Sequence, residues 1–391
     1  MQSMGPLERV LRTFEGKPVD RVPCFCAMME SRTANEVLGR PPLPMDRMLD
    51  LPPARFFLDN WGPALTPVFV RPALASTLHR RNLGQIGMGF DAIWAYMDDT
   101  WIFLDAKTIA LTTGSVFNVI PDGYGNLTYM YRGPGIATPE EFDAWPYWPD
   151  ADAVAHRVYR YYKKLMSRHG EKTCIFGYGF FGGPQEAMNW TFGIDRVPLW
   201  IRRHPAHVER FLNRMEEISI KTHTAMLDAG VRVILQTDDF AYKTGPFMSP
   251  AMVESLFGER YRRIIRNVHG RGAKYVLHSC GDNTRLFDTF IGWGVDGLHA
   301  YENTSNVDIY KEKKLHGDRV TIIGGVGIDY LLSERSRDEE IVEKVRELIV
   351  NLAPGGRFIL GPVHSEDGVP AHKLAVMIEA VQRYGAYPVS S

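Results

Sequence analysis

The chain has 391 residues, 45% of them hydrophobic, and a formal net charge of -1 at pH 7, so it can bury a large core and has no charge excess that would attract nucleic acid or an anionic membrane. Its four cysteines are too few for a disulfide framework in a chain of this size, which indicates a reducing compartment. No segment has the roughly 18 uninterrupted apolar residues of a membrane span, so we expect a soluble cytoplasmic protein.

Short apolar runs recur along the chain and predict strands. They occupy residues 23–29, 91–97, 173–179, 232–238, 274–280, 295–301, 319–325 and 357–364. Most are continuously apolar rather than alternating, which is typical of parallel strands covered on both faces. Helical patterns separate the later runs; one of them begins with Ser249 as N-cap and Pro250 at the first helical position. Repeated strand and helix units predict an α/β fold, a single (β/α)8 TIM barrel over residues 1–391.

Two regions depart from the simple repeat. Residues 1–22 predict an N-terminal helical extension. Residues 98–172 include two alternating segments around Asp122 and Gly123, a pair typical of a β-hairpin turn. We interpret residues 98–172 as an insertion after the second strand that covers the mouth of the barrel.

Polar side chains follow five of the predicted strands at their carboxyl ends. These residues include Asp98, Asp238, Asp239, His278, Cys280, Glu302 and His364. A single acid at such a place is often only a surface residue or a helix cap, and His299, inside its run, is typical of a hydrogen-bonded core histidine. In a barrel, however, the carboxyl ends of all strands open on one face, where active sites are built. The coincidence over five strands indicates an active site.

His278 and Cys280 are the clearest candidates for metal ligands. Residues i and i+2 of a strand lie on the same face, so an imidazole nitrogen and a thiolate can converge on one zinc ion. His364 and Glu302 are the candidates for the remaining ligands. Cys24 and Cys26 have the same spacing, but we interpret them as small apolar residues of a buried strand. The spacing alone also allows a strand end with an idle buried thiol.

Several longer segments resemble the uroporphyrinogen decarboxylase superfamily, in particular its branch related to zinc-dependent corrinoid methyltransferases. The resemblance extends over nearly the whole chain. It rests on "FEGKPVDRVP" (14–23), "DDFAYKTGPFMSP" (238–250), "HSCGDN" (278–283), "GVDGLHAYENTSNVDIYKEKKLHGDR" (294–319) and "PGGRFILGPVHSEDGVPAHKLAVMIEA" (354–380). The fold that the resemblance implies is again a (β/α)8 barrel.

The resemblance also implies a metal site, with one departure. The methyltransferase branch holds Zn2+ with a His-x-Cys pair, matched by His278 and Cys280, and with a later cysteine that is absent here. His364 stands in its place, as a histidine does in the decarboxylases, which leaves a His/Cys/His site, with or without Glu302, or no zinc. Asp98 matches the pyrrole-binding aspartate of the decarboxylases, but the arginine-rich stretch of those enzymes is missing.

From this resemblance we expect a zinc-dependent methyltransferase. It would move a methyl group from a methoxylated or methylated small molecule to the cobalt of a corrinoid (cobalamin), free or on a partner protein. Asp238 and Asp239 would hold or protonate the leaving group, and Asp98, Tyr178 and Tyr242 would line the pocket. Three alternatives stay open: a methylcobalamin:thiol methyltransferase, a metal-free decarboxylase, and a non-catalytic barrel that binds a corrinoid or tetrapyrrole. The oligomeric state stays open as well, with a homodimer among the options because related barrels often pair.

Overall fold

Eight parallel strands form the centre of the molecule in the computed structural model, which describes residues 3–42, 45–97, 100–121, 127–178, 182–299, 301, 305–329, 331–363 and 369–389. In sheet order they are β1 (Phe25–Cys26), β2 (Ala92–Tyr96), β7 (Cys174–Tyr178), β8 (Val233–Thr237), β11 (Lys274–His278), β12 (Gly297–His299), β13 (Thr321–Val326) and β14 (Phe358–Pro362). A parallel bridge between Cys24 and Leu360 joins β14 back to the chain just before β1. The predicted (β/α)8 barrel is confirmed, and each predicted run overlaps one of these strands.

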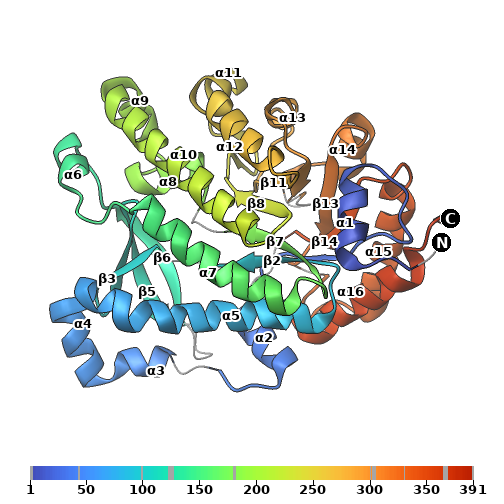
Figure 1. Cartoon of the computed structure of the whole chain (residues 1–391), viewed down its shortest axis with the longest axis horizontal. Helices are drawn as coiled ribbons and strands as arrows, with labels where there is room; N and C mark the ends of the chain where they lie inside the picture. The colour runs from blue at the N-terminus through green and yellow to red at the C-terminus, as the bar shows by residue number, and fades with distance from the viewer. Residues whose placement is uncertain are drawn as a thin grey trace.

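Helices surround this barrel (Figure 1). Between β1 and β2 lie α2 (Ser31–Leu38), α3 (Met45–Asp50), α4 (Pro52–Leu65), the π-helix η1 (Thr66–Val70) and α5 (Arg71–Met88). Before and after β7 lie α6 (Pro139–Ala144), α7 (Ala151–His169), α8 (Pro184–Phe192), α9 (Val197–Arg203) and α10 (Pro205–Asp228). The later strands are followed by α11 (Pro250–Val253), η2 (Glu254–Gly258), α12 (Glu259–His269), α13 (Phe287–Trp293), α14 (Ile309–His316), α15 (Asp338–Leu352) and α16 (Ala371–Tyr384). Within the described ranges, no helix is long and apolar enough to cross a membrane.

The N-terminal helix α1 (Pro6–Phe14) packs against β2, β7 and β14, and an ion cluster fastens it there. Arg9 and Arg21 each donate to the carboxylate of Asp91, both at 2.5 Å, and Arg9 also donates to Asp20 at 2.7 Å. Asp91 directly precedes β2 and also accepts the backbone N–H of Cys24 at 2.9 Å. Helix α1 therefore closes the amino end of the barrel.

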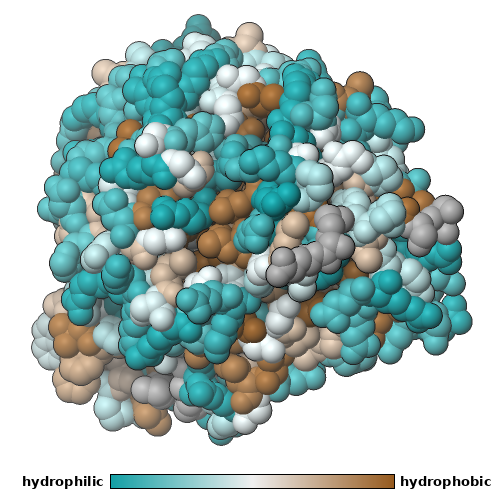
Figure 2. All heavy atoms as spheres, turned by 45° about the vertical axis from the view of Figure 1, so that its right-hand side comes forward, coloured by the Kyte–Doolittle hydropathy of each residue, from teal (hydrophilic) through white to brown (hydrophobic). Residues whose placement is uncertain are grey.

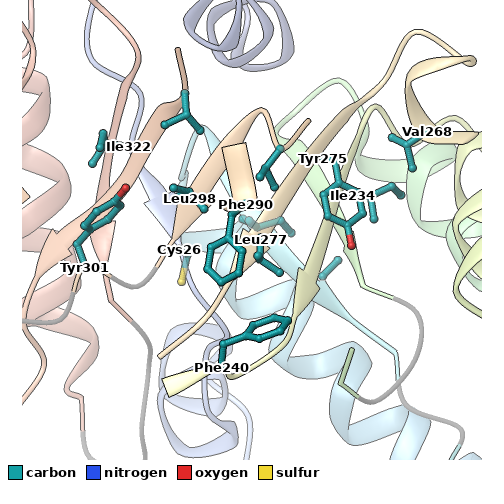
Figure 3. Close-up of a cluster of buried hydrophobic side chains, with 14 of the residues drawn as sticks. Cys26, Ile234, Phe240, Val268, Tyr275, Leu277, Phe290, Leu298, Tyr301 and Ile322 are labelled. Atoms are coloured by element: carbon teal, nitrogen blue, oxygen red, sulfur yellow. The ribbon is translucent and has the colours of Figure 1, made fainter. Parts of the chain in front are cut away.

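Alternation along the strands separates two apolar layers. In β11, Val276 belongs to the cluster inside the barrel, whereas Tyr275 and Leu277 belong to the layer between the strands and the helices. Figure 3 shows Tyr275 and Leu277 together with Ile234 of β8 in this outer layer. The parity of a residue within its strand therefore decides whether its side chain faces the barrel interior.

On the face seen in Figure 2 the surface is mainly hydrophilic, with small hydrophobic groups between the polar residues.

The region between β2 and β7 contains an antiparallel sheet in the order β3 (Trp101–Asp105), β4 (Thr108–Leu111), β5 (Ser115–Pro121) and β6 (Leu127–Pro134). The predicted turn at Asp122 and Gly123 lies outside the described residues, and β5 and β6 on either side of it are paired antiparallel. The sheet has a separate small core that includes Phe103, Ile109 and Phe117, with Leu58 of α4. The rest of segment 98–172 includes α7, which packs against α10 in the helical layer.

Candidate metal centre and active site

Three side chains with metal-binding atoms meet at the carboxyl ends of β8 and β11. The ligand atoms of Asp239, His278 and Cys280 all lie within 4.8 Å of one another. Cys280 Sγ is 3.3 Å from His278 Nε2. His278 is buried, and Asp239 and Cys280 are half-buried, so the cluster lies at the edge of the interior.

The local sequence explains how His278 and Cys280 come to face the same way. Val276 faces the barrel interior, so alternation also points His278 inward, and the chain continues to Cys280 in the same sense. Gly281 then turns with a φ of +85°, and a Cβ there would lie 2.4 Å from the carbonyl oxygen of Ala241. Only glycine fits this close approach. The side-chain amide of Asn283 donates to the carbonyl oxygen of Cys280 at 2.8 Å and holds the turn.

Asp239 joins this pair from the next strand. Its Oδ1 accepts the backbone N–H of Cys280 at 2.8 Å, so the carboxylate is held beside the thiol by the loop that carries the thiol. From the sequence we expect Asp239 to hold or protonate the leaving group. In the structure its carboxylate lies among the candidate metal-binding atoms.

The donor set fits a zinc ion. Bond lengths of about 2.1 Å to nitrogen and 2.3 Å to sulfur in a tetrahedral site put the two ligand atoms about 3.6 Å apart. His278 Nε2 and Cys280 Sγ are 3.3 Å apart, which is close to that separation. A carboxylate, an imidazole and a thiolate are all zinc ligands. The predicted ligands His364 and Glu302, and the pocket residue Asp98, lie outside the described residues.

Asp238 lies on the other side of the barrel wall. Its carboxylate accepts the backbone N–H groups of Gln185 at 3.1 Å and Glu186 at 2.5 Å, and the Tyr261 hydroxyl at 2.5 Å. Burial raises the pKa of Asp238 to about 7, although these hydrogen bonds oppose the shift. A Cβ on Gly183 would lie 2.4 Å from Asp238 Cγ, so a glycine lets the carboxylate reach the start of α8. Asp238 thus caps α8 instead of facing the barrel interior with Asp239.

Sequence reasoning missed Glu186, in the first turn of α8. Burial raises the pKa of Glu186 well above its usual range, and the charges of Asp239 and Asp238 raise it further. Its Oε1 accepts from the indole N–H of Trp190 at 3.4 Å, and its Oε2 is buried with no hydrogen-bond partner in the described part of the chain. Glu186 is therefore an acid beside the candidate centre whose raised pKa favours its protonated form. An acid in a first helical turn is so common that the sequence carries no signal for this role.

Aromatic side chains of β2 and β7 form a wall beside the centre. The ring of Tyr178 stacks on that of Tyr96 with centroids 5.1 Å apart, and Trp94 lies 5.3 Å from the ring of His278. The Tyr178 hydroxyl is 3.1 Å from the Thr237 hydroxyl and accepts the backbone N–H of Gly182 at 2.7 Å.

The second tyrosine predicted for the pocket lies elsewhere. Tyr242 lies on the hairpin of β9 (Ala241–Tyr242) and β10 (Gly245–Pro246), above the turn at Gly281, and its side chain is exposed. The structure thus brings Tyr178 close to the centre and leaves Tyr242 on the surface.

The other candidate thiols are buried in the barrel. Cys24 and Cys26 are both fully shielded, and burial raises the pKa of each thiol above its usual value. Their backbone atoms help to close the barrel between β1 and its neighbours. Within the described ranges, the one cluster of metal-binding side chains is that of Asp239, His278 and Cys280.

Comparison with known proteins identifies the family. The family model described as "Uroporphyrinogen decarboxylase (URO-D)" matches residues 96–384, which is more than half of the chain. The chain belongs to this family. A solved structure of a "methyltransferase from Methanosarcina mazei" covers 98% of this chain and 99% of its own, with a TM-score of 0.61 and 19% identity, and shares the URO-D barrel fold.

Curated relatives carry more specific names. Two proteins named "Methylcobamide:CoM methyltransferase MtaA", from Methanosarcina barkeri and its strain Fusaro, are each 23% identical to the chain over 184 residues. The aligned part is 47% of this chain and 51% of each relative, so the chain spans about half the length of the curated relatives it matches.

Proposed function

We propose that this URO-D family member is a zinc-dependent methyltransferase that transfers the methyl group of a methoxylated or N-methylated small molecule to the cobalt of a corrinoid protein. The observation that carries the proposal is the convergence of Asp239, His278 and Cys280 at the carboxyl end of the barrel. The names of the curated relatives, which are methylcobamide methyltransferases, support the same class of reaction.

In this proposal His278 Nε2, Cys280 Sγ and a carboxylate oxygen of Asp239 hold the metal ion, and His364 and Glu302 remain candidates for further ligands. When bound, the ion would polarise the ether oxygen or amine of the substrate and make it a better leaving group. The backbone N–H of Cys280 orients the carboxylate of Asp239 for this task, in the way that hydrogen bonds orient ligands in known metal sites.

The leaving group needs a proton, and Glu186 is placed to supply it. When the methyl carbon accepts the electron pair of cobalt(I), the bonding pair of the broken bond stays on the substrate oxygen or nitrogen. Glu186 favours its protonated form, because burial and the charges of Asp239 and Asp238 raise its pKa. It donates this proton to the leaving atom and becomes a carboxylate, as a general acid does. Asp238 acts as a positioning residue, since it caps the helix that carries Glu186.

The aromatic wall favours a flat substrate. Trp94 lies 5.3 Å from the ring of His278, and the stacked rings of Tyr96 and Tyr178 lie beside Trp94. Stacking of an aromatic ring on such a wall is favourable by about 0.5–1.5 kcal/mol beyond the burial of its surface. We therefore propose an aromatic methyl ether as the substrate class.

A thiol methyltransferase is the second candidate, and the names of the curated relatives favour it. The same three residues would then hold a metal that lowers the pKa of a substrate thiol. The thiolate would take the methyl group from methylcobalamin, so no leaving oxygen would need a proton. Glu186 is required in the first reaction and dispensable in the second.

The test combines metal analysis with two assays. We expect the purified protein to contain about one equivalent of zinc, and to methylate cob(I)alamin with methoxyaromatic compounds. His278→Ala and Cys280→Ala should lose both the zinc and the activity, whereas Cys174→Ala, which removes a buried thiol at the start of β7, should keep both. A wild-type protein without zinc would contradict the proposal and favour a metal-free decarboxylase or a non-catalytic barrel. Methyl transfer from methylcobalamin to a thiol, without demethylation of ethers, would favour the second candidate.

A further inference from the structure

We infer that His299 is a positioning residue that fixes the tautomer of His278, so that Nε2 of His278 carries a lone pair toward the centre; this inference rests on the metal site of the proposed function. The two histidines are paired in register on the parallel strands β11 and β12. Their Nδ1 atoms are 2.6 Å apart, and the residues are only 5% and 3% exposed. Two imidazoles at this distance share one proton between the two nitrogens.

The backbone of β14 sets the direction of this hydrogen bond. His299 Nε2 lies 3.3 Å from the carbonyl oxygen of Pro362. A carbonyl oxygen only accepts, so Nε2 of His299 must carry the proton. In a neutral imidazole the other nitrogen then accepts, so His299 Nδ1 accepts a hydrogen bond from His278 Nδ1. Nε2 of His278 is left without a proton, and it is this atom that lies 3.3 Å from Cys280 Sγ.

Metal binding by His278 requires the same tautomer. A histidine binds a metal ion through an unprotonated nitrogen, and its second nitrogen commonly donates to a neighbouring acceptor. The opposite pair of tautomers would put a proton on His278 Nε2, in the position of the metal. It would also leave a lone pair of His299 facing the carbonyl oxygen of Pro362. Only one pair of neutral tautomers satisfies both ends.

Packing keeps the two rings in this orientation. The ring of Phe25 meets that of His299 edge to face with centroids 5.2 Å apart, and Trp94 lies beside both histidines. Turning the His299 ring over would exchange Nδ1 with Cδ2 and break its bonds to His278 and Pro362. His299 is therefore a buried core residue that also orients His278, a side chain of the proposed metal site.

The direct test is the tautomer itself, measured in the metal-free protein. Long-range ¹H–¹⁵N spectra of the histidine-labelled chain, assigned with His278→Gln and His299→Asn, should show His278 protonated on Nδ1 and not on Nε2. His299→Leu removes the acceptor and should shift His278 toward the other tautomer. His299→Asn keeps an acceptor near the Nδ1 position and should preserve the wild-type form. Protonation of wild-type His278 on Nε2 would overturn the inference.

Metal affinity gives the second readout. By competition with a chelator, His299→Leu should weaken zinc binding about 10- to 100-fold, the usual effect of losing a partner that orients a ligand, and His299→Asn should recover most of it. His223→Leu is the matched control, since His223 is another buried histidine, bonded to Gln236 on the helical side. It should leave the affinity unchanged.

The outcomes separate this inference from the proposed function. Loss of zinc in His278→Ala together with full affinity in folded His299→Leu would overturn the inference and leave the metal site standing. Absence of zinc from the wild type would contradict the proposed function, while the spectra of the metal-free protein would still decide the tautomer. Circular dichroism and thermal unfolding of the Leu and Asn variants show whether both are folded.

Discussion

The backbone N–H of Cys280 donates to Asp239 Oδ1 at 2.8 Å, and this bond ties the end of β8 to the loop that follows β11. One residue thus contributes a thiol to the centre and also orients the carboxylate that faces it. In the proposed site Asp239 holds the metal ion through a carboxylate oxygen, while the same carboxylate accepts the hydrogen bond of the loop. Two separate contributions of Asp239, a charge for the ion and an acceptor for the loop, can be tested one at a time.

Asp239→Asn should keep the acceptor for Cys280 and lose the anionic ligand. We expect zinc affinity to fall about tenfold or more, because a structured site loses one ligand while the loop stays in place. Asp239→Ala should weaken binding further, since the loop then also loses its hydrogen bond. Chelator competition measures both variants.

Asp282→Asn is the control for charge near the site. Asp282 lies two residues from Cys280, but its carboxylate accepts from the backbone and hydroxyl of Thr284, at 3.1 Å and 2.6 Å. This variant should bind zinc as the wild type does. If Asp239→Asn binds zinc equally well, Asp239 is not a ligand.

Glu186→Gln should separate the two methyl transfer reactions. Glutamine retains the shape of the side chain but carries no acidic proton, so demethylation of an aromatic ether should slow about 10²- to 10⁴-fold. Zinc content should not change. Methyl transfer from methylcobalamin to a thiol, if the protein catalyses it, should proceed at the wild-type rate because that reaction requires no acid. Equal ether demethylation by the variant and the wild type would exclude Glu186 as the proton donor.

The pH dependence of ether demethylation should follow the same group. The acid must be protonated before it donates, and burial together with the charges of Asp239 and Asp238 raises the pKa of Glu186. The rate should therefore be highest at lower pH and fall as the pH rises through this raised pKa. In Glu186→Gln the falling limb should disappear. A limb that persists in the variant would have to belong to another group.

Sequence reasoning predicted the strands because buried parallel strands are continuously apolar. It predicted that the side chains of His278 and Cys280 face the same way because residues i and i+2 of a strand lie on one face. It could not separate Asp238 from Asp239. Adjacent residues of a strand face opposite sides of the sheet. A shift of one residue in the predicted strand therefore reverses which of the two aspartates faces the barrel interior. The centre also depends on contacts between side chains of different strands, such as His278 of β11 with His299 of β12, which no pattern within one strand contains.

Gly183→Ala should damage the site from outside it. The new Cβ would lie 2.4 Å from Asp238 Cγ, so the carboxylate must move away from the start of α8. We expect a destabilisation of about 1–3 kcal/mol, typical of overpacking, together with slower catalysis as Glu186 loses its position. Gly292→Ala in α13 is the control, since no atom lies within 4 Å of its Cβ. It should stabilise the protein by about 0.4–1 kcal/mol in urea unfolding. Similar effects of the two substitutions would contradict this account.

Arg9→Met should destabilise the barrel at its amino end, far from the centre. Arg9 is buried and bonds both Asp20 and Asp91, so its removal leaves a buried carboxylate short of a partner, and breaking such a pair usually destabilises by about 3–5 kcal/mol. Arg12→Met, which breaks only exposed contacts, to Glu8 at 3.4 Å and to the carbonyl oxygen of Pro18 at 2.9 Å, should change stability by about 1 kcal/mol or less. Urea unfolding at neutral pH measures both.

The acid limb of stability should change with the same substitution. Burial opposes ionisation of Asp20, but the hydrogen bond from Arg9 and further donors outweigh it and lower the pKa of Asp20 well below its usual value. A carboxyl group with a lowered folded pKa stabilises the protein above its unfolded pKa of about 3.9, and this stabilisation is lost as the pH falls toward the folded value. In Arg9→Met the folded pKa of Asp20 should move back toward the unfolded one. The fall in unfolding free energy below about pH 4 should therefore be shallower in Arg9→Met than in the wild type, and an unchanged acid limb would show that Arg9 does not hold the Asp20 carboxylate in its ionised form.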